Sequence, residues 1–462
     1  MATRRLAYLF PTFPVLHQTF TLGEVLGLEE AGYDLVLVSL KRTGAGLQQP
    51  GARCVVERTI YCPPLFSRPM VAACARALRI RPRDLFRLFA DVVRAWRVRV
   101  PERTAPGGDD DTTMGWKEKL RGVYHCNRWV YLAKSLIMVP FAIFIADVFE
   151  RERIGHVHAH WATYPATVAW LIRRWSGIAY SFTAHAYDIH MVQQMLPSKI
   201  EDAEFVVTCA EVNRRFLRAL CPTPAADRIH VNYHGTDLDR FVPRRHANAD
   251  RAGFRVVGCG SLEEYKGFHY LLDAIALMAD GGVDVSCELA GDGPQRSFLQ
   301  ARAKRLGIER RVSFRGFVDQ AALAEIYSRA DAFAMPSVCL GRYGKQDVIP
   351  NVLAEAMACG VPVVGSDIAG IPELIEDGRS GLLVPERDAH SLAAALKCLN
   401  EDTELARRLS KEGLAKVRSI WDRRNNVREL ARLIDVFVDA PGTYVQGKCA
   451  DAASRVNLGA VR

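Results

Sequence analysis

No two cysteines of this 462-residue chain have the CxxC spacing, and the 12 cysteines are scattered along it. Cysteine-bound metals and disulfide scaffolds need clustered cysteines. Cys209 and Cys287 each stand within an apolar run, which is typical of a buried thiol. We therefore predict free cysteines in a reducing compartment.

Long uncharged apolar runs are also missing. The most apolar one, LIMVPFAIFIA at 136–146, is too short to span a bilayer and is bounded by Lys134 and Asp147. We expect a buried or half-inserted helix there. The apolar run at the amino terminus stops at Pro11 with no signal-peptide core, which favours a cytoplasmic protein with at most peripheral membrane attachment.

The formal net charge of +9 is modest but unevenly placed. Apolar residues such as Phe86 and Trp96 alternate with arginines between Arg76 and Arg103, which predicts basic amphipathic helices suited to an anionic inner-membrane surface. A solvated helical face is the alternative, and nucleic acid is not expected because no known binding motif accompanies the patch. The arginines of this segment are Arg76, Arg79, Arg81, Arg83, Arg87, Arg94, Arg97, Arg99 and Arg103.

The order of predicted elements indicates an α/β fold with two doubly wound domains. Strands at 6–10 and 34–40 flank a helix that ends at Gly32, and strand–helix alternation resumes at 156–161. A second series of strands and helices starts near 255 and runs to about 420. Residues 41–135 are less regular, with a linker predicted at 101–115, and residues 441–462 are predicted to form a loose tail.

The stretch from Asp347 to Glu373 carries the most chemical information. It is predicted as a loop, a helix with Asn351 as its N-cap, a left-handed Gly360 and a buried strand. The free N–H groups at the start of such a helix form an anion site suited to a phosphate. Asp347 before the helix and Glu355 inside it could hold hydroxyl groups at the two ends of a ligand.

This stretch resembles the Glu-x7-Glu motif of the retaining glycosyltransferases of family 4, although Asp347 stands where most members carry Glu. The continuation EAMACGVPVVGSDIAGIPELIEDGRSGLLVP is similar to the same family almost throughout. The segments PVLHQTF, HAHWATYPA and SFTAHAYDIH resemble its colanic-acid or exopolysaccharide branch. The resemblance implies the GT-B fold, with two Rossmann-like domains facing a cleft. Residues 1–238 would bind the acceptor, residues 239–420 would bind the nucleotide-sugar, and a helix at 421–438 would pack back on the first domain.

The resemblance also implies a donor site in the second domain. Lys266 would meet the diphosphate, Asp347 the sugar hydroxyls and Glu355 the ribose hydroxyls. Ser261 stands where the family usually has an arginine, and Arg342 or Lys345 could supply the missing cation. The expected donor-binding residues are Gly260, Ser261, Lys266, Gly291, Asp347, Val348, Ile349, Asn351, Val352 and Glu355.

In the first domain the resemblance places His185 beside the transferred sugar, so that His185, Asp347 and Lys266 form the expected catalytic set. His17, Thr19, Asp188 and His190 are the candidate acceptor contacts.

No metal or cofactor is expected. His156, His158 and His160 alternate on a strand, but no carboxylate at ligand spacing joins them, and the resemblance implies a metal-independent enzyme.

The function implied is a retaining hexosyltransferase that moves a sugar from a UDP- or GDP-sugar to a polysaccharide or lipid-linked glycan, through a front-face, oxocarbenium-like route. A glycoside hydrolase is disfavoured, because both carboxylates are fixed around one helix start instead of flanking a scissile bond. Two alternatives stay open. One is a GT-B nucleotide-sugar epimerase, and the other is a non-catalytic sugar-binding protein at the membrane, which the departures at Ser261 and Asp347 suggest.

Overall fold

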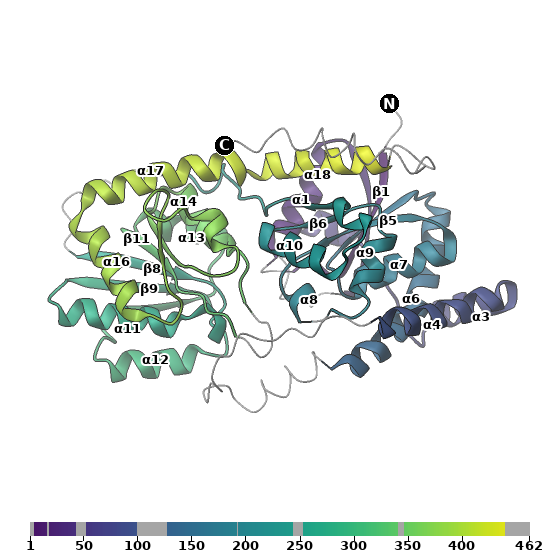
Figure 1. The fold of residues 1–462 in the computed structure, drawn as a ribbon, viewed down its shortest axis with the longest axis horizontal. Helices are drawn as coiled ribbons and strands as arrows, with labels where there is room; N and C mark the ends of the chain where they lie inside the picture. Colours follow the sequence, from purple (N-terminus) through teal and green to yellow (C-terminus); the bar gives the residue numbers. More distant parts are fainter. Residues whose placement is uncertain are drawn as a thin grey trace. The chain divides into compact units, whose positions relative to one another are not determined.

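The computed structural model describes residues 4–15, 18–42, 52–98, 127–191, 193–243, 253–340 and 346–438. The chain divides into two compact units (Figure 1). Unit 1 comprises residues 1–232 and 427–462, and unit 2 comprises residues 233–426. Unit 2 is thus inserted in the sequence of unit 1, and its limits lie within a few residues of the predicted 239–420.

Unit 1 is built on a seven-stranded sheet of order β3-β2-β1-β4-β5-β6-β7, and each neighbouring pair is parallel. A central β1 paired with both β2 and β4 is the doubly wound arrangement that the strand–helix alternation predicts. The first two strands are longer than predicted because they pair from Arg4↔Tyr33 to Phe13↔Arg42. The strands are β1 Arg4–Phe13, β2 Tyr33–Arg42, β3 Ile60–Tyr61, β4 His156–His160, β5 Ala179–Ala184, β6 Val206–Thr208 and β7 Ile229–Val231.

Helices follow the strands of unit 1, as expected for crossover connections. The basic segment up to Arg97 is helical, as predicted, and forms two helices. Arg99, Arg103, the linker at 101–115 and the tail at 441–462 lie outside the described residues. The helices are α1 Thr19–Glu30, α2 Arg53–Arg58, α3 Arg68–Ile80, α4 Pro82–Arg97, α6 Arg128–Arg151, α7 Tyr164–Ser176, α8 Tyr187–His190, α9 Leu196–Asp202, α10 Glu211–Leu220 and the 3-10 turn η2 Pro224–Arg228.

Helix α6 corrects one prediction. The apolar run at 136–146 lies inside a helix of 24 residues, which among the described residues is the one helix long and apolar enough to cross a membrane. The helix extends beyond the run because Asn127 caps its start by accepting from the N–H groups of Trp129 and Val130. Residues such as Val139 and Ile143 are buried in the core of unit 1, and 44% of the most apolar part of the helix is buried, which agrees with the expectation of a buried or half-inserted helix.

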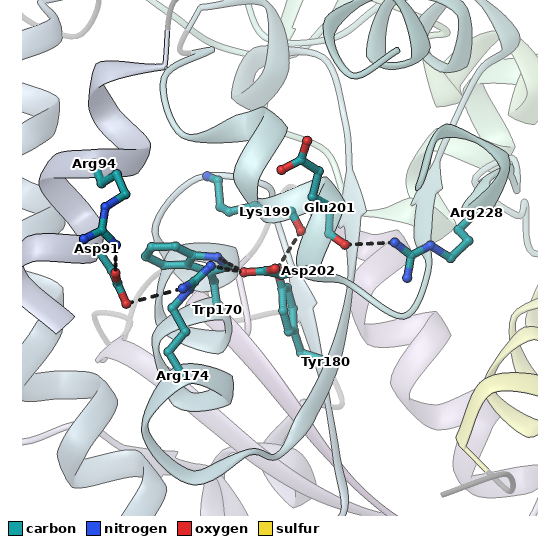
Figure 2. A network of polar contacts seen from close by, with 9 residues as sticks. All are labelled: Asp91, Arg94, Trp170, Arg174, Tyr180, Lys199, Glu201, Asp202 and Arg228. Carbon is teal, nitrogen blue, oxygen red and sulfur yellow. Dashed lines mark hydrogen bonds and ion pairs between the residues drawn. The ribbon is translucent and has the colours of Figure 1, made fainter. Parts of the chain in front are cut away.

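A network of polar contacts fastens α4 to α7 and α9 (Figure 2). Asp91 is buried and accepts from Arg94 at 2.6 Å and from Arg174 at 3.3 Å. Arg174 continues to Asp202, which also accepts from the indole N–H of Trp170 at 2.7 Å. The basic helix α4 is therefore held against α7 and α9 of unit 1 by a buried carboxylate, and we refer to these five residues as the α4 latch.

The opposite face of the sheet is covered by α1 and by the end of the chain. Helix α18, Arg423–Val438, starts in unit 2 and continues into unit 1. Leu430, Leu433 and Ile434 are buried in one apolar cluster with Tyr8 and Val25. The last helix therefore packs back on unit 1 and contributes side chains to its core.

Unit 2 is built on a six-stranded parallel sheet of order β10-β9-β8-β11-β12-β13, which is again doubly wound. Its strands are largely buried on both faces, as expected for a parallel sheet covered by helices. The strands are β8 Phe254–Cys259, β9 Val285–Ala290, β10 Val312–Gly316, β11 Ala332–Met335, β12 Val363–Ser366 and β13 Leu382–Val384. The helices are η3 Glu264–Lys266, α11 Phe268–Asp280, α12 Arg296–Arg305, α13 Gln320–Ser328, α14 Asn351–Ala358, α15 Ile371–Leu374, α16 Ala389–Glu401 and α17 Thr403–Ile420.

None of the ten cysteines among the described residues forms a disulfide bond, as predicted. Cys209 and Cys287 are buried, and Cys54 and Cys398 are exposed.

Candidate functional site

The strand order of unit 2 reverses at β8, which has β9 on one side and β11 on the other. In open parallel sheets, ligands bind beyond the carboxyl ends of the strands at such a switch point. The loops that follow β8, β9 and β11 carry Lys266, Gly291 and Asp347 respectively. The topology therefore gathers the predicted donor residues at one edge of the sheet.

Two glycines bring the loops after β8 and β9 into direct backbone contact. Gly260 has φ of +150° and Gly291 has φ of +138°, a region that side chains rarely tolerate. A Cβ added to Gly291 would stand 1.9 Å from the carbonyl oxygen of Gly260. The backbone at Gly260, directly before Ser261, therefore leaves no room for a side chain at position 291.

Lys266 is buried and paired. Its Nζ lies 2.8 Å from Oδ1 of Asp347, and the hydroxyl of Ser337 donates to Oδ2 of the same carboxylate at 2.7 Å. Burial works to lower the pKa of Lys266, but the carboxylate of Asp347 outweighs it and the pKa is raised above its usual value. The ammonium group of Lys266 therefore keeps its proton at neutral pH and is ion-paired with Asp347. Arg342 and Lys345 lie outside the described residues.

Ser337 is a site residue that sequence reasoning missed. It follows β11 in DAFAMPS and is fully buried. Its position just past a buried strand, at the same carboxyl edge, was the available signal.

Helix α14 starts at Asn351 as predicted, but Asn351 is its first residue and not its N-cap. Pro350 occupies the N-cap position with φ of −64° and ψ of 121°, and no side chain caps the helix. Its ψ is extended, so the helix begins at the next residue, one position earlier than an N-cap at Asn351 would give. The start of α14 thus has no capping side chain to occupy its first N–H groups.

The residues on either side of this helix start are held by neighbouring backbone. The carbonyl of Val348 accepts from the N–H of Gly370 at 3.0 Å, and the carbonyl of Val352 accepts from the hydroxyl of Tyr327 at 3.3 Å. A Cβ added to Gly370 would stand 2.8 Å from Ile349. Gly360 has φ of +76° and ends the helix in the predicted left-handed conformation.

Glu355 has surroundings unlike those of Asp347. Its side chain is buried, and burial raises its pKa to about 7, with small opposing contributions from the hydroxyl of Tyr327 and the charge of Arg240. The hydroxyl of Tyr327 lies 3.5 Å from Oε2. The surroundings of the two predicted carboxylates thus differ, because Asp347 is ion-paired with Lys266 whereas burial raises the pKa of Glu355.

In unit 1, His185 directly follows β5, and its ring lies among other aromatic rings. The ring centroids of Trp161 and Phe20 are 4.2 Å and 5.4 Å from that of His185. Trp161 has φ of +91°, which is strained for a residue with a Cβ, and its buried indole N–H has no hydrogen-bond partner. Strained backbone and unpaired donors both concentrate at functional sites.

Asp188 and His190 are fixed to the backbone around His185. Asp188 accepts from the N–H groups of Ala162 at 2.7 Å and His185 at 2.9 Å, and burial raises its pKa to about 6. Asn213 donates to the carbonyl of His185 at 2.8 Å and lies 3.1 Å from Nε2 of His190. Both predicted acceptor residues therefore support the loop that carries His185.

The two other predicted acceptor residues lie toward the amino terminus. Thr19 is the first residue of α1, and His17 lies outside the described residues.

The histidine row on β4 does have a carboxylate nearby, so the expectation that none joins it is wrong. Glu24 of α1 lies 3.4 Å from Nδ1 of His160, and ligand atoms of Glu24, His158 and His160 lie within 4.8 Å of one another. Spacing along the chain does not reveal this approach, because α1 and β4 are far apart in sequence. One charged residue in the otherwise apolar TLGEVLGL was the available signal.

Both ring nitrogens of His158 already have partners. Nδ1 lies 2.8 Å from the hydroxyl of Ser181, and Nε2 lies 2.8 Å from that of Thr183. A metal ion would have to displace one of these hydrogen bonds, so the group is better suited to hydrogen bonding than to coordination.

Comparison with known proteins agrees with this geometry. Residues 253–402 match the family described as glycosyl transferases group 1. The chain is 34% identical over 218 residues to WcaL of Escherichia coli K12, named as a colanic acid biosynthesis glycosyltransferase, covering 47% of this chain and 52% of WcaL. It is 26% identical over 438 residues to the amylovoran biosynthesis glycosyltransferase AmsK of Erwinia amylovora, covering 93% of this chain and 99% of AmsK. The chain thus spans about half the length of WcaL and nearly all of AmsK.

Solved structures share the two-unit architecture. Sucrose-phosphate synthase from Thermosynechococcus elongatus superposes with a TM-score of 0.67 at 20% identity, covering 95% of this chain and all of the other. HepE from Anabaena, solved in complex with UDP, superposes with a TM-score of 0.62 at 17% identity, covering 94% of this chain and all of the other. With these matches and two doubly wound parallel sheets, the chain has the GT-B fold and carries a glycosyl transferases group 1 domain.

Proposed function

We propose that this protein is a retaining, metal-independent hexosyltransferase that moves a sugar from a nucleoside diphosphate to a polysaccharide or lipid-linked glycan. The names of WcaL and AmsK support exopolysaccharide synthesis, and the UDP in the HepE structure supports a nucleotide-sugar donor. A GDP-sugar donor is supported equally well. A further relative, from Mycolicibacterium smegmatis and 32% identical over 243 residues, is named as a GDP-mannose-dependent mannosyltransferase.

The observation that carries this proposal is the buried Lys266–Asp347 pair beside the start of α14. A buried ammonium ion that keeps its proton is suited to a diphosphate, and hydrogen bonds to charged groups contribute about 1.5–3 kcal/mol each. The N–H groups of Asn351 and Val352 at the helix start add further donors. Both features favour a leaving group on which negative charge builds during the reaction.

The remaining donor contacts follow from the carboxylates. Glu355 would accept from the ribose hydroxyls and Asp347 from the sugar, while Gly260 and Gly291 would let the diphosphate approach the backbone. We propose that His185 of unit 1 steadies positive charge on the sugar during transfer. With no nucleophile assigned, retention would come from attack on the same face that the diphosphate leaves.

We also propose that unit 1 attaches to an anionic membrane surface through α3 and α4, and that the acceptor is reached there. Ile80 and Phe86 are 71% and 68% exposed, beside the exposed guanidinium groups of Arg79, Arg83 and Arg87. Exposed apolar side chains among arginines are what an interfacial helix presents to lipid headgroups. A lipid-linked acceptor would be concentrated at the same surface.

The proposal is tested with purified protein and a panel of UDP- and GDP-sugars. A true donor should raise the melting temperature and be slowly hydrolysed without an acceptor. The Lys266→Gln variant should lose at least about tenfold in donor affinity, which corresponds to 1.4 kcal/mol. Lys397→Gln, on an exposed lysine of the same unit, is the matched control and should bind donor like the parent protein.

The same assay separates the alternatives. An epimerase would convert the donor to a product of equal mass without any acceptor. A non-catalytic binding protein would bind a donor without turnover. Absence of stabilisation by every donor, with the protein folded, would overturn the proposal.

A further inference from the structure

The ion pair of Lys266 and Asp347 brings a negative charge into the donor site together with the positive one. Nζ of Lys266 lies 2.8 Å from Oδ1 of Asp347, and the two side chains are only 10% and 13% exposed. Charges that are shielded from water act on a ligand more strongly than exposed charges do. The carboxylate of Asp347 therefore acts on any anion that contacts Lys266.

Asp347 is held in this position through both of its oxygens. The hydroxyl of Ser337, which is fully buried, donates to Oδ2 at 2.7 Å, while Oδ1 accepts from Lys266. Within the part of the chain that the structure describes, Lys266 is the one cation paired with Asp347. A ligand anion at Lys266 therefore shares the cation on which this carboxylate depends.

A phosphate bound to Lys266 has to lie close to the carboxylate. A phosphate oxygen accepts from an ammonium group at about 2.8 Å, and Nζ is already 2.8 Å from Oδ1 of Asp347. The two anionic oxygens are then no farther apart than about twice this distance. At such a separation, repulsion between like charges in a partly shielded site changes an affinity by about 10- to 100-fold.

The donor and its diphosphate product meet this carboxylate differently. In the donor, sugar hydroxyl groups can donate to Asp347 and offset the repulsion. During transfer the sugar passes to the acceptor hydroxyl, which loses its proton, and the electron pair of the broken bond stays on the phosphate oxygen. The diphosphate thereby gains a negative charge at neutral pH. The product therefore has one more negative charge near Asp347 and no sugar hydroxyl to offset it.

We propose that Asp347 lowers the affinity of the site for the free nucleoside diphosphate and so promotes release of the product. The inference rests on the proposed function, because it takes Lys266 as the diphosphate contact. It gives Asp347 a second role besides the sugar contact. Removal of a simple sugar contact would leave the affinity for the free diphosphate unchanged, and removal of a residue that only supports Lys266 would weaken it.

The test measures the binding of UDP, GDP and the panel of UDP- and GDP-sugars to the full chain by calorimetry. In Asp347→Asn, the free diphosphate that the parent protein binds should bind at least about tenfold more tightly. The donor should gain less affinity or lose affinity, because its sugar contact is weakened. Dissociation of the diphosphate, followed by stopped-flow displacement, should become slower by a similar factor. Asp347→Glu restores a carboxylate and should bind the diphosphate like the parent protein.

Asp273→Asn is the matched control. Asp273 on α11 is also ion-paired, because its Oδ1 accepts from Nε of Arg302 at 2.7 Å, and the substitution changes the net charge of unit 2 by the same amount. This variant should bind the free diphosphate like the parent protein. An equal gain in both variants would assign the effect to net charge and overturn the inference.

Unchanged or weaker binding of the free diphosphate in Asp347→Asn also overturns the inference, while the proposed function stands if the parent protein binds and turns over a donor. A folded parent protein that binds neither a diphosphate nor a donor overturns both. Should Asp347→Asn not fold, Asp347→Ser also removes the charge and is judged by the same criterion.

Discussion

The two acidic residues of the site show how surroundings divide the roles of similar side chains. Asp347 has a lysine and a serine hydroxyl as partners, whereas Glu355 is buried with one weak hydrogen bond. A carboxylate without a cation at hand is easier to protonate. The donor would therefore bind to a carboxyl group whose pKa the fold has raised to about 7.

Glu355 should make the protein less stable as the pH rises. Its pKa is about 7 in the folded state against an ordinary 4.5, so the folded state holds a proton that the unfolded state has lost between these values. Stability therefore falls between about pH 4.5 and 7, by about 3 kcal/mol in total. Glu355→Gln should remove this fall, and urea unfolding at pH 5 and pH 8 measures it.

The control for this prediction is Glu309→Gln, on an exposed acid of the same unit. It should follow the pH dependence of the parent protein. If Glu355→Gln and the parent protein lose equal stability between the two pH values, the burial of Glu355 is not the cause. Glu355→Gln should also bind donor less well than the parent protein. Above pH 7 this variant should therefore be the more stable protein but the weaker donor binder.

At the scale of elements, the close approach of the loops after β8 and β9 should not tolerate a methyl group. Gly291→Ala would force an alanine into a backbone conformation with φ of +138°, which residues with a Cβ rarely adopt. It would also place the new Cβ 1.9 Å from the carbonyl oxygen of Gly260. We expect a loss of about 2–5 kcal/mol in the free energy of unfolding, together with weaker donor binding.

Gly282→Ala separates strain from crowding. Gly282 has φ of +82°, but an added Cβ would meet nothing within 4 Å. This variant should lose only about 1–2 kcal/mol and keep donor binding. Equal losses in the two variants would show that crowding at Gly291 is unimportant.

The α4 latch should hold the basic helix α4 against α7 and α9. Asp91→Asn removes the charge between Arg94 and Arg174, and because both guanidinium groups are partly exposed we expect a loss of about 1–3 kcal/mol. Limited proteolysis within α4 should become faster. Asp84→Asn, at a more exposed ion pair of the same helix, is the control and should change neither. If Asp91→Asn and Asp84→Asn were cleaved within α4 at the same rate, the α4 latch would not be what holds this helix in place.

Sequence reasoning succeeded where the signal is local. The strands, the helices and the placement of Lys266, Asp347 and Glu355 at one sheet edge follow from patterns along the chain. It failed where two distant segments meet. Nothing near His160 in the sequence points to Glu24, and nothing near Asp347 fixes which of its oxygens Ser337 and Lys266 take. Asn351 was misplaced as a cap because the proline before it competes for that position.

At the scale of the whole molecule, the protein should bind anionic vesicles. Each arginine near such a surface contributes about 1 kcal/mol, so changing Arg79, Arg83 and Arg87 to Glu should weaken binding at least about 100-fold. Co-sedimentation with vesicles of anionic or neutral lipid, at low and high salt, measures it.

Three substitutions to Glu on α17, at Arg407, Arg408 and Lys411, give the same change in net charge on unit 2. These should bind vesicles far better than the α3–α4 variant. Equal weakening in both variants would point to net charge in place of a defined surface, and no binding by the parent protein would exclude membrane attachment through these helices.

The return of α18 has a consequence for how the chain matures. Leu430, Leu433 and Ile434 complete the core of unit 1, yet they are synthesised after all of unit 2. At about 5–20 residues per second, ribosomes need about 10–40 s to travel from Asn232 to Val427. During that interval the apolar face of β1 and β2 that α18 later covers stays exposed to solvent. The nascent amino-terminal half is therefore the species that chaperones would have to bind.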